Sequence, residues 1–322
     1  MKSTADTRPM TRGAATMLAA AALAWTVTVP APAMAAIGYP DPGGIYTPFT
    51  DCPLHNPAMR LAAPGFAMGC IKSITPSGTF TINGVPVAIT QPVIVQFGTY
   101  SDMDANGNQV FHVVPTQDGN DLVAQPEVIP NGMLVLLCSS TDPRAVKLCQ
   151  LAMNTGKTDL SVQVQLAGPI TNFSPLAETP FTLPIKIKLT NPLLGGTCYI
   201  GSNSDPILLN PMFNPVGSLA FEPDPDPTTF PNVAVLSING STLTDDTFSV
   251  PAATGCGPGG SANGAINAVL GLPSPSGNNH LVLNDNTALF ADDFSESNQA
   301  QDLLAAFKAS VGVASPSGAF VE

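Results

Sequence analysis

Two segments with the same order of features constrain the fold of this chain more than any other part of its sequence. In residues 183–210 (LPIKIKLTNPLLGGTCYIGSNSDPILLN), a strand-like alternation leads through a Gly-Gly corner to Cys198. In residues 246–257 (DTFSVPAATGCG), a shorter strand and a turn lead to Cys256. We interpret the two segments as neighbouring strands that are joined by a disulfide.

Residues 1–35 have the pattern of a secretory signal peptide. Three basic side chains precede an apolar run at residues 13–29, and Ala33-Met34-Ala35 supplies the small residues of a cleavage site. The apolar run is short for a membrane span and is followed by prolines, which favours cleavage over anchoring. We therefore expect a secreted, extracellular chain that begins at Ala36 and has no membrane span.

The expected mature chain is strongly acidic. Without the signal peptide, 8 basic and 22 acidic side chains remain, so its net charge is −14. So few positive side chains cannot form a basic surface along a nucleic-acid phosphate backbone, which argues against nucleic acid as a partner. The same deficit argues against anionic lipid surfaces.

Six cysteines in an exported chain indicate three disulfides. They allow 15 pairings, and their spacing favours the nearest-neighbour set of Cys52–Cys70, Cys138–Cys149 and Cys198–Cys256. Each bridge is expected to contribute about 3–4 kcal/mol to stability. A structural zinc site is disfavoured because the sequence has no C-x-x-C motif and no Cys/His pair at ligand spacing.

Short strand-like segments run through most of the chain. The clearest hairpin spans residues 78–89, with Asn83-Gly84 as its turn, and residues 160–166 alternate strictly between apolar and polar side chains. Asn239-Gly240 predicts a second hairpin turn. Residues 280–283 and 287–290 are predicted as two separate late strands.

Helical patterns are few and modest. We predict helices at residues 142–153 and 262–270, the second one capped by Ser261, and a C-terminal helix at residues 296–309. The fold class is therefore all-β, an antiparallel β-sandwich-like fold with disulfides and two or three short helices. Residues 154–158 are a candidate boundary between two β halves, and residues 311–322 are expected to be a loose tail.

One turn has the pattern of half a calcium loop. Asp102, Asp104 and Asn106 occupy the first, third and fifth positions of such a loop, and Gly107 follows them. The twelfth position is Val113, so the bidentate carboxylate of a complete loop is missing. A polar hairpin turn is the favoured interpretation, and calcium binding is the alternative.

No other motif predicts a catalytic, cofactor-binding or metal-binding residue. His55, His112 and His280 lie at no ligand spacing, and the sequence around Ser261 (GGSAN) lacks the last glycine of a nucleophile elbow. Three carboxylates alternate with prolines in residues 221–231, which suits an exposed loop better than a catalytic pair.

Three motifs, taken in order, resemble a group of exported actinobacterial proteins of unknown function. They are NPLLGGTCYIGSNSDPILLN (residues 191–210), DDTFSVPAATGCG (245–257) and GLPSPSGNN (271–279). The hairpin GTFTINGVPVAIT is also similar to that group. The resemblance implies secretion, a β-rich fold and the pairing of Cys198 with Cys256, and it implies no activity.

Three functions are compatible with these patterns. The favoured hypothesis is a secreted, non-enzymatic β-rich protein that binds a partner outside the cell or at its surface, or forms part of the envelope. The alternatives are a secreted hydrolase with a site assembled from distant loops, and a calcium-dependent adhesion or carbohydrate-binding module. The scarcity of aromatic side chains disfavours sugar binding.

Overall fold

A computed structural model describes most of the expected mature chain. The residues that it describes are 44–49, 51–53, 56–60, 68–175, 177–223 and 233–293. All of them belong to one compact unit, Pro40–Glu322. The predicted signal peptide, the helix predicted at residues 296–309, the predicted tail, most of the acidic proline-rich loop and His55 lie outside the described residues.

The larger of two sheets, sheet A, has ten strands in the described residues. Six of them run in the order β12-β14-β16-β1-β4-β5, while β13 pairs with β14, β2 with β16, β3 with β2 and β6 with β4. Their bounds are β1 (Met68–Thr75), β2 (Ser77–Ile82), β3 (Val85–Ile89), β4 (Val93–Met103), β5 (Gln109–Val114), β6 (Leu122–Ala124), β12 (Met212–Phe213), β13 (Ser218–Pro223), β14 (Val233–Asp245) and β16 (His280–Asp293).

The smaller sheet, sheet B, has six strands in the described residues, in the order β15-β10-β9-β8-β7 with β11 beside β9. They are β7 (Glu127–Ile129), β8 (Leu160–Leu166), β9 (Leu183–Thr190), β10 (Tyr199–Ile200), β11 (Ile207–Leu209) and β15 (Ala253–Thr254). All strand pairs of both sheets are antiparallel. The predicted fold class, all-β and antiparallel with a sandwich-like arrangement, is confirmed.

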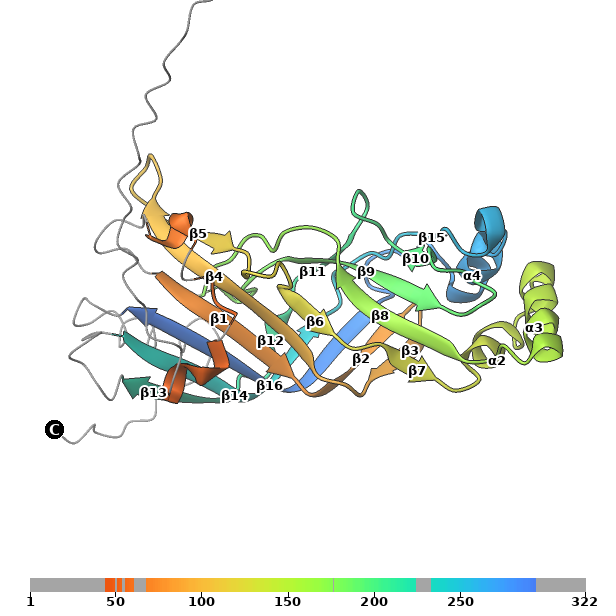
Figure 1. The fold of residues 1–322 in the computed structure, drawn as a ribbon, viewed down its shortest axis with the longest axis horizontal. Coiled ribbons are helices and arrows are strands. Elements are labelled where there is room, and N and C mark those ends of the chain that lie inside the picture. Colours follow the sequence, from red (N-terminus) through yellow and green to blue (C-terminus); the bar gives the residue numbers. More distant parts are fainter. Residues whose placement is uncertain are drawn as a thin grey trace, which may run out of the picture. The chain divides into compact units, whose positions relative to one another are not determined.

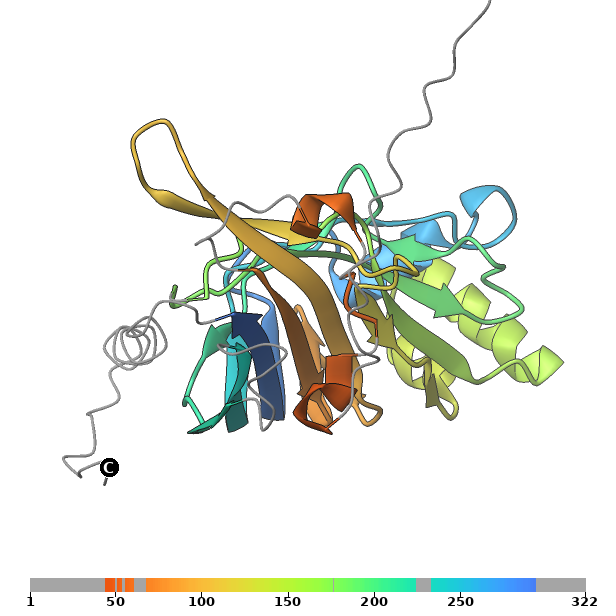
Figure 2. The same cartoon turned by 60° about the vertical axis from the view of Figure 1, so that its left-hand side comes forward.

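Three helices lie together beside sheet B (Figures 1 and 2). They are α2 (Gly132–Leu137), α3 (Pro143–Thr155) and α4 (Asn263–Leu270); a single turn, α1 (Pro57–Arg60), and two 3₁₀ turns, Gly44–Phe49 and Pro258–Gly260, complete the helical part. Helix α3 begins as expected for its sequence, since Asp142 accepts a hydrogen bond from the Arg144 N–H (2.8 Å). No helix of the described residues is long and apolar enough to cross a membrane.

One cluster of buried apolar side chains includes residues of both sheets. Phe97 comes from sheet A, and Ile185 and Ile187 come from sheet B, where they alternate with Lys186 and Lys188 as the sequence predicts. The candidate boundary at residues 154–158 covers the end of α3 and the start of the loop to β8, and the chain on both sides of it contributes to this same cluster.

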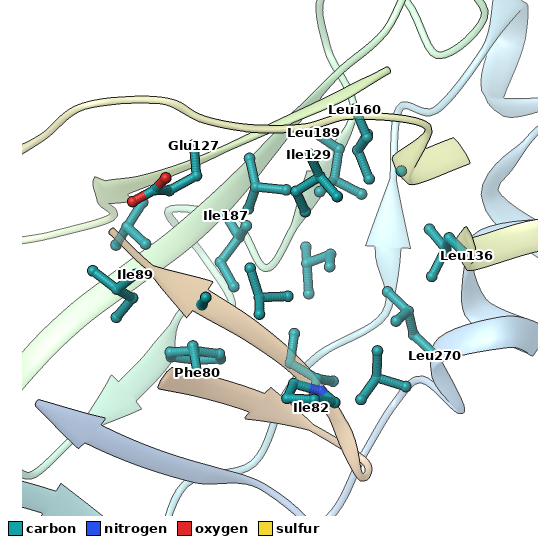
Figure 3. Close-up of a pocket in the computed structure, with 18 of the residues that line it drawn as sticks. Phe80, Ile82, Ile89, Glu127, Ile129, Leu136, Leu160, Ile187, Leu189 and Leu270 are labelled. Atoms are coloured by element: carbon teal, nitrogen blue, oxygen red, sulfur yellow. The ribbon is translucent and has the colours of Figure 1, made fainter. Parts of the chain in front are cut away.

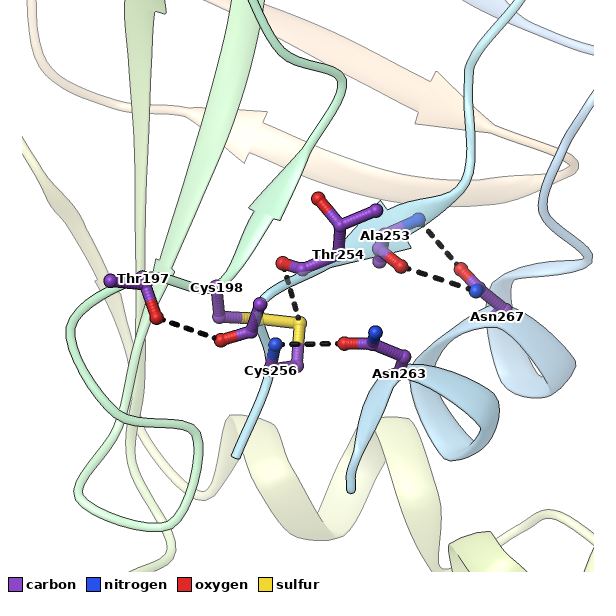
Figure 4. Close-up of a disulfide and its surroundings, with 8 residues drawn as sticks. Thr197, Cys198, Ala253, Thr254, Cys256, Asn263 and Asn267 are labelled. Atoms are coloured by element: carbon purple, nitrogen blue, oxygen red, sulfur yellow. Dashed lines mark hydrogen bonds between the residues drawn. A yellow bond between two sulfur atoms is a disulfide. The ribbon is translucent and has the colours of Figure 1, made fainter. Parts of the chain in front are cut away.

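All three predicted disulfides are present: Cys52–Cys70, Cys138–Cys149 and Cys198–Cys256. The third lies where β10 pairs with β15 (Figure 4). Residues 183–210 and 246–257 therefore do contain neighbouring strands that a disulfide joins. Helix α4 is attached to the same corner, because Asn263 Oδ1 accepts a hydrogen bond from the Cys256 N–H (2.8 Å) and Asn267 Oδ1 accepts one from the Ala253 N–H (2.7 Å).

Two expectations for late strands are wrong. Asn239-Gly240 lies inside β14 rather than in a hairpin turn, and the two strands predicted at 280–283 and 287–290 form the single strand β16. The register between β14 and β16 shifts at this point, and Gly240 and Asp285 have left-handed backbones (φ 73° and 52°). Asn-Gly pairs suit bulges as well as turns, because both need left-handed residues.

Candidate functional site

A pocket of the described residues lies between the two sheets. Its volume is about 280 Å³. The hairpin β2–β3 forms one wall, the inner faces of β8 and β9 form the opposite wall, and residues of α2 and α4 line one end (Figure 3). Strand β3 is an edge of sheet A and β7 is an edge of sheet B, so the pocket lies where neither sheet continues.

Aliphatic side chains dominate the lining of this pocket. The wall from sheet A includes Phe80, Ile82, Val85, Val87 and Ile89, and the wall from sheet B includes Leu160, Val162, Val164, Ile187 and Leu189. Several of these side chains remain half-buried, among them Val87 and Val162. The lining contains no His, Lys, Arg, Asp or Cys among the residues that the structure describes. Its few polar members are Gln91, Gln125, Glu127 and Ser139.

The alternation of the hairpin strand β3 explains its place in the wall. Val85, Val87 and Ile89 are half-buried, while Pro86 and Ala88 are exposed. Pro86 is tolerated because an edge strand has no partner on one side for its missing N–H. The predicted turn is confirmed, since Asn83 and Gly84 both have left-handed backbones (φ 46° and 80°).

The tip of the hairpin is attached to the segment after α4 by Asn279. This side chain is 1% exposed, and its Oδ1 accepts a hydrogen bond from the Asn83 N–H (3.1 Å). Its Nδ2 donates to the carbonyls of Phe248 (3.0 Å) and Pro275 (2.9 Å). The tip also lies against Gly271, where an added Cβ would be 2.1 Å from Asn83 Nδ2.

The other end of the hairpin is attached to sheet B by Glu127, on β7. Its carboxylate accepts hydrogen bonds from the N–H and hydroxyl of Thr90 and from the Gln91 N–H (2.6 Å). Partial burial disfavours the charged form, but the bonds from Thr90 and Gln91 outweigh it and hold the pKa of Glu127 below its usual value. The wall is therefore held at both ends by side-chain hydrogen bonds.

The two carboxylates of the calcium-loop pattern are both bonded to donors of the protein. Asp104 accepts hydrogen bonds from the N–H groups of Asn106 and Asn108 (both 2.8 Å), and these bonds, those of Asn108 foremost, hold its pKa below the usual value. Asp102 Oδ1 lies 2.9 Å from His112 Nε2. No group of three His, Cys, Asp or Glu side chains within the described ranges could hold a metal ion.

The remaining candidates from the sequence are dispersed. His112 stacks on Tyr100 with ring centroids 4.7 Å apart, at the β4–β5 hairpin, and His280 is exposed at the start of β16. Ser261 does not cap α4 as predicted: the capping position is Ala262, which makes no side-chain cap bond. None of these residues lines the pocket.

Sequence reasoning missed the pocket itself. One signal of it is the run GMLVLL of α2, which is apolar on all sides and so leaves Val135 72% exposed beside the pocket. Comparisons with known proteins give no further guide to function. No protein-family model matches the chain, and neither the curated proteins nor the solved structures contain a match.

Proposed function

We propose that this is a secreted, non-enzymatic binding protein that holds the aliphatic part of a small, uncharged amphiphile between its two sheets. The observation that carries the proposal is the pocket of about 280 Å³. Its volume is close to the lower end of ordinary small-ligand sites, which span roughly 300–1,000 Å³.

The chemistry of the walls favours an aliphatic ligand. Half-buried valines and isoleucines, such as Val87, Ile89 and Val162, face one another across the space. An aliphatic chain that covers them removes apolar surface from water on both partners, which is favourable by roughly 25 cal/mol per Å². The polar lining residues Gln91, Gln125 and Ser139 are suited to hydrogen-bonding a neutral headgroup.

The polar groups of the pocket support binding over catalysis. Hydrolysis needs a nucleophile or activated water and a general base within hydrogen-bond reach of it. The carboxylate of Glu127 is already bonded to Thr90 and Gln91, and the described lining offers no histidine beside Ser139. Residues placed in this way can hold a ligand but have no evident means of cleaving it.

Secretion is part of the proposal. Residues 1–35 have the signal-peptide pattern, and three disulfides suit an oxidising compartment. The ligand is therefore expected outside the cell or at its surface, where a carrier or an envelope component would meet amphiphiles.

A binding measurement on two matched variants tests the proposal. The mature protein, with its disulfides intact, would be titrated with 1-octanol in competition with an environment-sensitive apolar dye. Val162→Phe fills the pocket and is expected to weaken octanol binding at least tenfold. Val128→Phe, on the paired strand β7, changes a valine that is 63% exposed and outside the lining, and is expected to bind as the unchanged protein does.

Two results would overturn the proposal. One is the absence of any saturable octanol binding to the unchanged protein. The other is equal binding by the Val162→Phe and Val128→Phe variants, because the ligand would then lie elsewhere. Circular dichroism of both variants shows whether each retains the fold.

A further inference from the structure

Two smaller cavities extend the pocket along the space between the sheets. The first, of about 50 Å³, shares Phe80, Ile89, Val93 and Val164 with the pocket. The second, of about 70 Å³, shares Ser73, Phe181 and Leu243 with the first. The three spaces therefore form one row, in which neighbouring cavities share lining residues.

The lining of the far cavity includes Asn286, a buried side chain whose amide oxygen has no hydrogen-bond partner among the described residues. Asn286 is 0% exposed, and its Nδ2 donates to Ser73 Oγ (2.7 Å) and Thr75 Oγ1 (2.8 Å). Its Oδ1 has no hydrogen-bond partner among the described residues. Buried polar atoms are nearly always paired, so this one points to a donor that the chain does not supply.

The position of Asn286 follows from the bulge in β16. Leu281 and Leu283 pack in the main apolar cluster, and after Asp285 it is Phe290 that belongs to this cluster while Leu289 packs on the opposite face, so the alternation changes phase at Asp285. Asn286 and Ala288 have the same phase as Phe290 and line the far cavity with it. Without this bulge, Asn286 would point to the other face of the sheet. The irregular strand thus places an amide at the end of a row of mainly apolar cavities.

The group that would donate a hydrogen bond to Asn286 Oδ1 is uncharged. Neither smaller cavity is lined by an Asp, Glu, Lys, Arg or His among the described residues. An ammonium group there would be buried without a counter-charge, which is strongly unfavourable. A hydroxyl carries one donor and no charge, and it matches the single free acceptor.

We propose that the three cavities form one channel for a single linear aliphatic chain that carries a hydroxyl group bonded to Asn286 Oδ1. The proposal rests on the proposed function of the large pocket and specifies its ligand class. The headgroup lies among the polar residues of the pocket, the chain passes between Phe80 and Val164, and the hydroxyl ends at the far cavity. Branched or ring-containing ligands fill the pocket but not the channel.

A chain-length series tests the channel. Linear 1-alkanols of 8 to 16 carbons would compete with the apolar dye for the mature protein. Each added methylene is expected to tighten binding about fourfold until the channel is full. Leu122→Phe fills the middle cavity without touching the large pocket, so 1-octanol should bind normally while the gain ends at a shorter chain.

The neighbouring residue on β6 provides the control for this series. Val123→Phe adds the same ring on the opposite face, outside all three linings, and is expected to keep the full length dependence. The same length dependence in Leu122→Phe as in the unchanged protein would overturn the channel. Failure of 1-octanol to bind the unchanged protein would instead overturn the proposed function.

A series of linear α,ω-diols tests the role of Asn286. The diol whose second hydroxyl reaches Asn286 Oδ1 is expected to bind about two- to tenfold tighter than diols two carbons longer or shorter. In Asn286→Leu this preference for one length should vanish, while 1-octanol binding, read in parallel, shows that the pocket is intact. A diol series without a preferred length would overturn the hydroxyl assignment. If the Asn286→Leu protein does not bind 1-octanol, the milder variant Asn286→Ser is tested with the same diol series.

Discussion

Two regions border the space between the sheets and are attached differently: the corner where β10 pairs with β15, and the hairpin β2–β3. The corner is covalent, because Cys198 and Cys256 are bonded, and α4 adds side-chain bonds to it. The hairpin is held at its tip by Asn279 and at its other end by Glu127, in both cases only by hydrogen bonds. One side of the pocket thus lies near a covalent bridge, while the hairpin on the other side depends on side-chain hydrogen bonds and on the β2–β16 ladder.

This contrast bears on the proposed binding function. A disulfide limits the unfolded chain and keeps the corner closed under native conditions. Hydrogen bonds contribute about 0.5–1.5 kcal/mol each and exchange with water on opening. We therefore expect the hairpin to admit the ligand while sheet B keeps its shape.

The largest effect is expected from removing the disulfide of the corner. Replacing Cys198 and Cys256 together by alanine should lower the free energy of unfolding by about 4 kcal/mol, because the bridge closes a loop across 58 positions. Urea unfolding followed by circular dichroism measures this loss. Under native conditions octanol binding should change little. If this variant lost more octanol binding than the hairpin variants described next, the hairpin would not be the part of the pocket that opens for the ligand.

The second effect concerns the tip of the hairpin. Asn279→Leu leaves the Asn83 N–H and the carbonyls of Phe248 and Pro275 without their partner, so we expect a loss of about 2–3 kcal/mol in unfolding free energy. Octanol binding should weaken several-fold because the wall loses its position. The exposed neighbour serves as the control: Asn278→Leu should leave both quantities within error, and an equal effect of the two changes would show that the tip is not held by Asn279.

A smaller, pH-dependent effect is expected at the other end of the hairpin. The pKa of Glu127 is lower in the folded protein than in the unfolded chain, so its stabilising contribution is complete above about pH 4.3, the ordinary value for Glu. The contribution is lost as the pH falls through the lowered pKa. The protection of the Thr90 and Gln91 amides, measured as exchange relative to the intrinsic rate at each pH, should decrease as the pH falls through this window. Glu127→Gln should show faster exchange already at pH 7, with a loss of about 1 kcal/mol.

The control for the Glu127 variant is an exposed carboxylate of sheet A. Glu222→Gln should leave hydrogen exchange at Thr90 and Gln91 unchanged at every pH. If the Glu127→Gln and Glu222→Gln proteins exchange alike, the hairpin is not held by Glu127.

The smallest effect is expected at the turn with the calcium-loop pattern, which touches neither wall. The exposed carboxylate of Asp104 is already bonded to Asn106 and Asn108, so calcium would have to displace these donors. We expect the melting temperature to stay within 1 °C, roughly the precision of such a scan, when calcium is added or chelated. A calcium-induced rise that disappears in Asp104→Ala would restore the calcium-dependent module as the better hypothesis.

The parts of the fold that sequence reasoning captured are those with local causes. The turn Asn83-Gly84 forms because its two residues accept left-handed backbones, and the alternation of β9 follows from one buried face. The pairing of Cys198 with Cys256 was also legible, because two strand-like segments of similar pattern each lead to a cysteine. Each of these features needs little knowledge of the rest of the chain.

The pocket could not be predicted in the same way. It depends on how Val87 of one sheet faces Val162 of the other, and nothing in either strand specifies that distance. The bulge near Asp285 was equally hidden, because an aspartate with a left-handed backbone leaves no distinct pattern. Asn239-Gly240 was misinterpreted because the pair serves a bulge as readily as a turn.

Strand β16 carries a consequence for the order in which the protein matures. It pairs with β14 on one side and with β1 and β2 on the other, so it joins the parts of sheet A that come first and last in the chain. Residue Gly69 meets Asp292 across more than two hundred positions, and pairings this distant form slowly. Until residues 280–293 are in place, sheet A remains in three pieces, and one of them is the hairpin β2–β3 with only its own strands as partners. The wall of the proposed binding pocket is thus completed by the last described strand, and a chain that ends before residue 280 would leave the hairpin without its neighbour in sheet A.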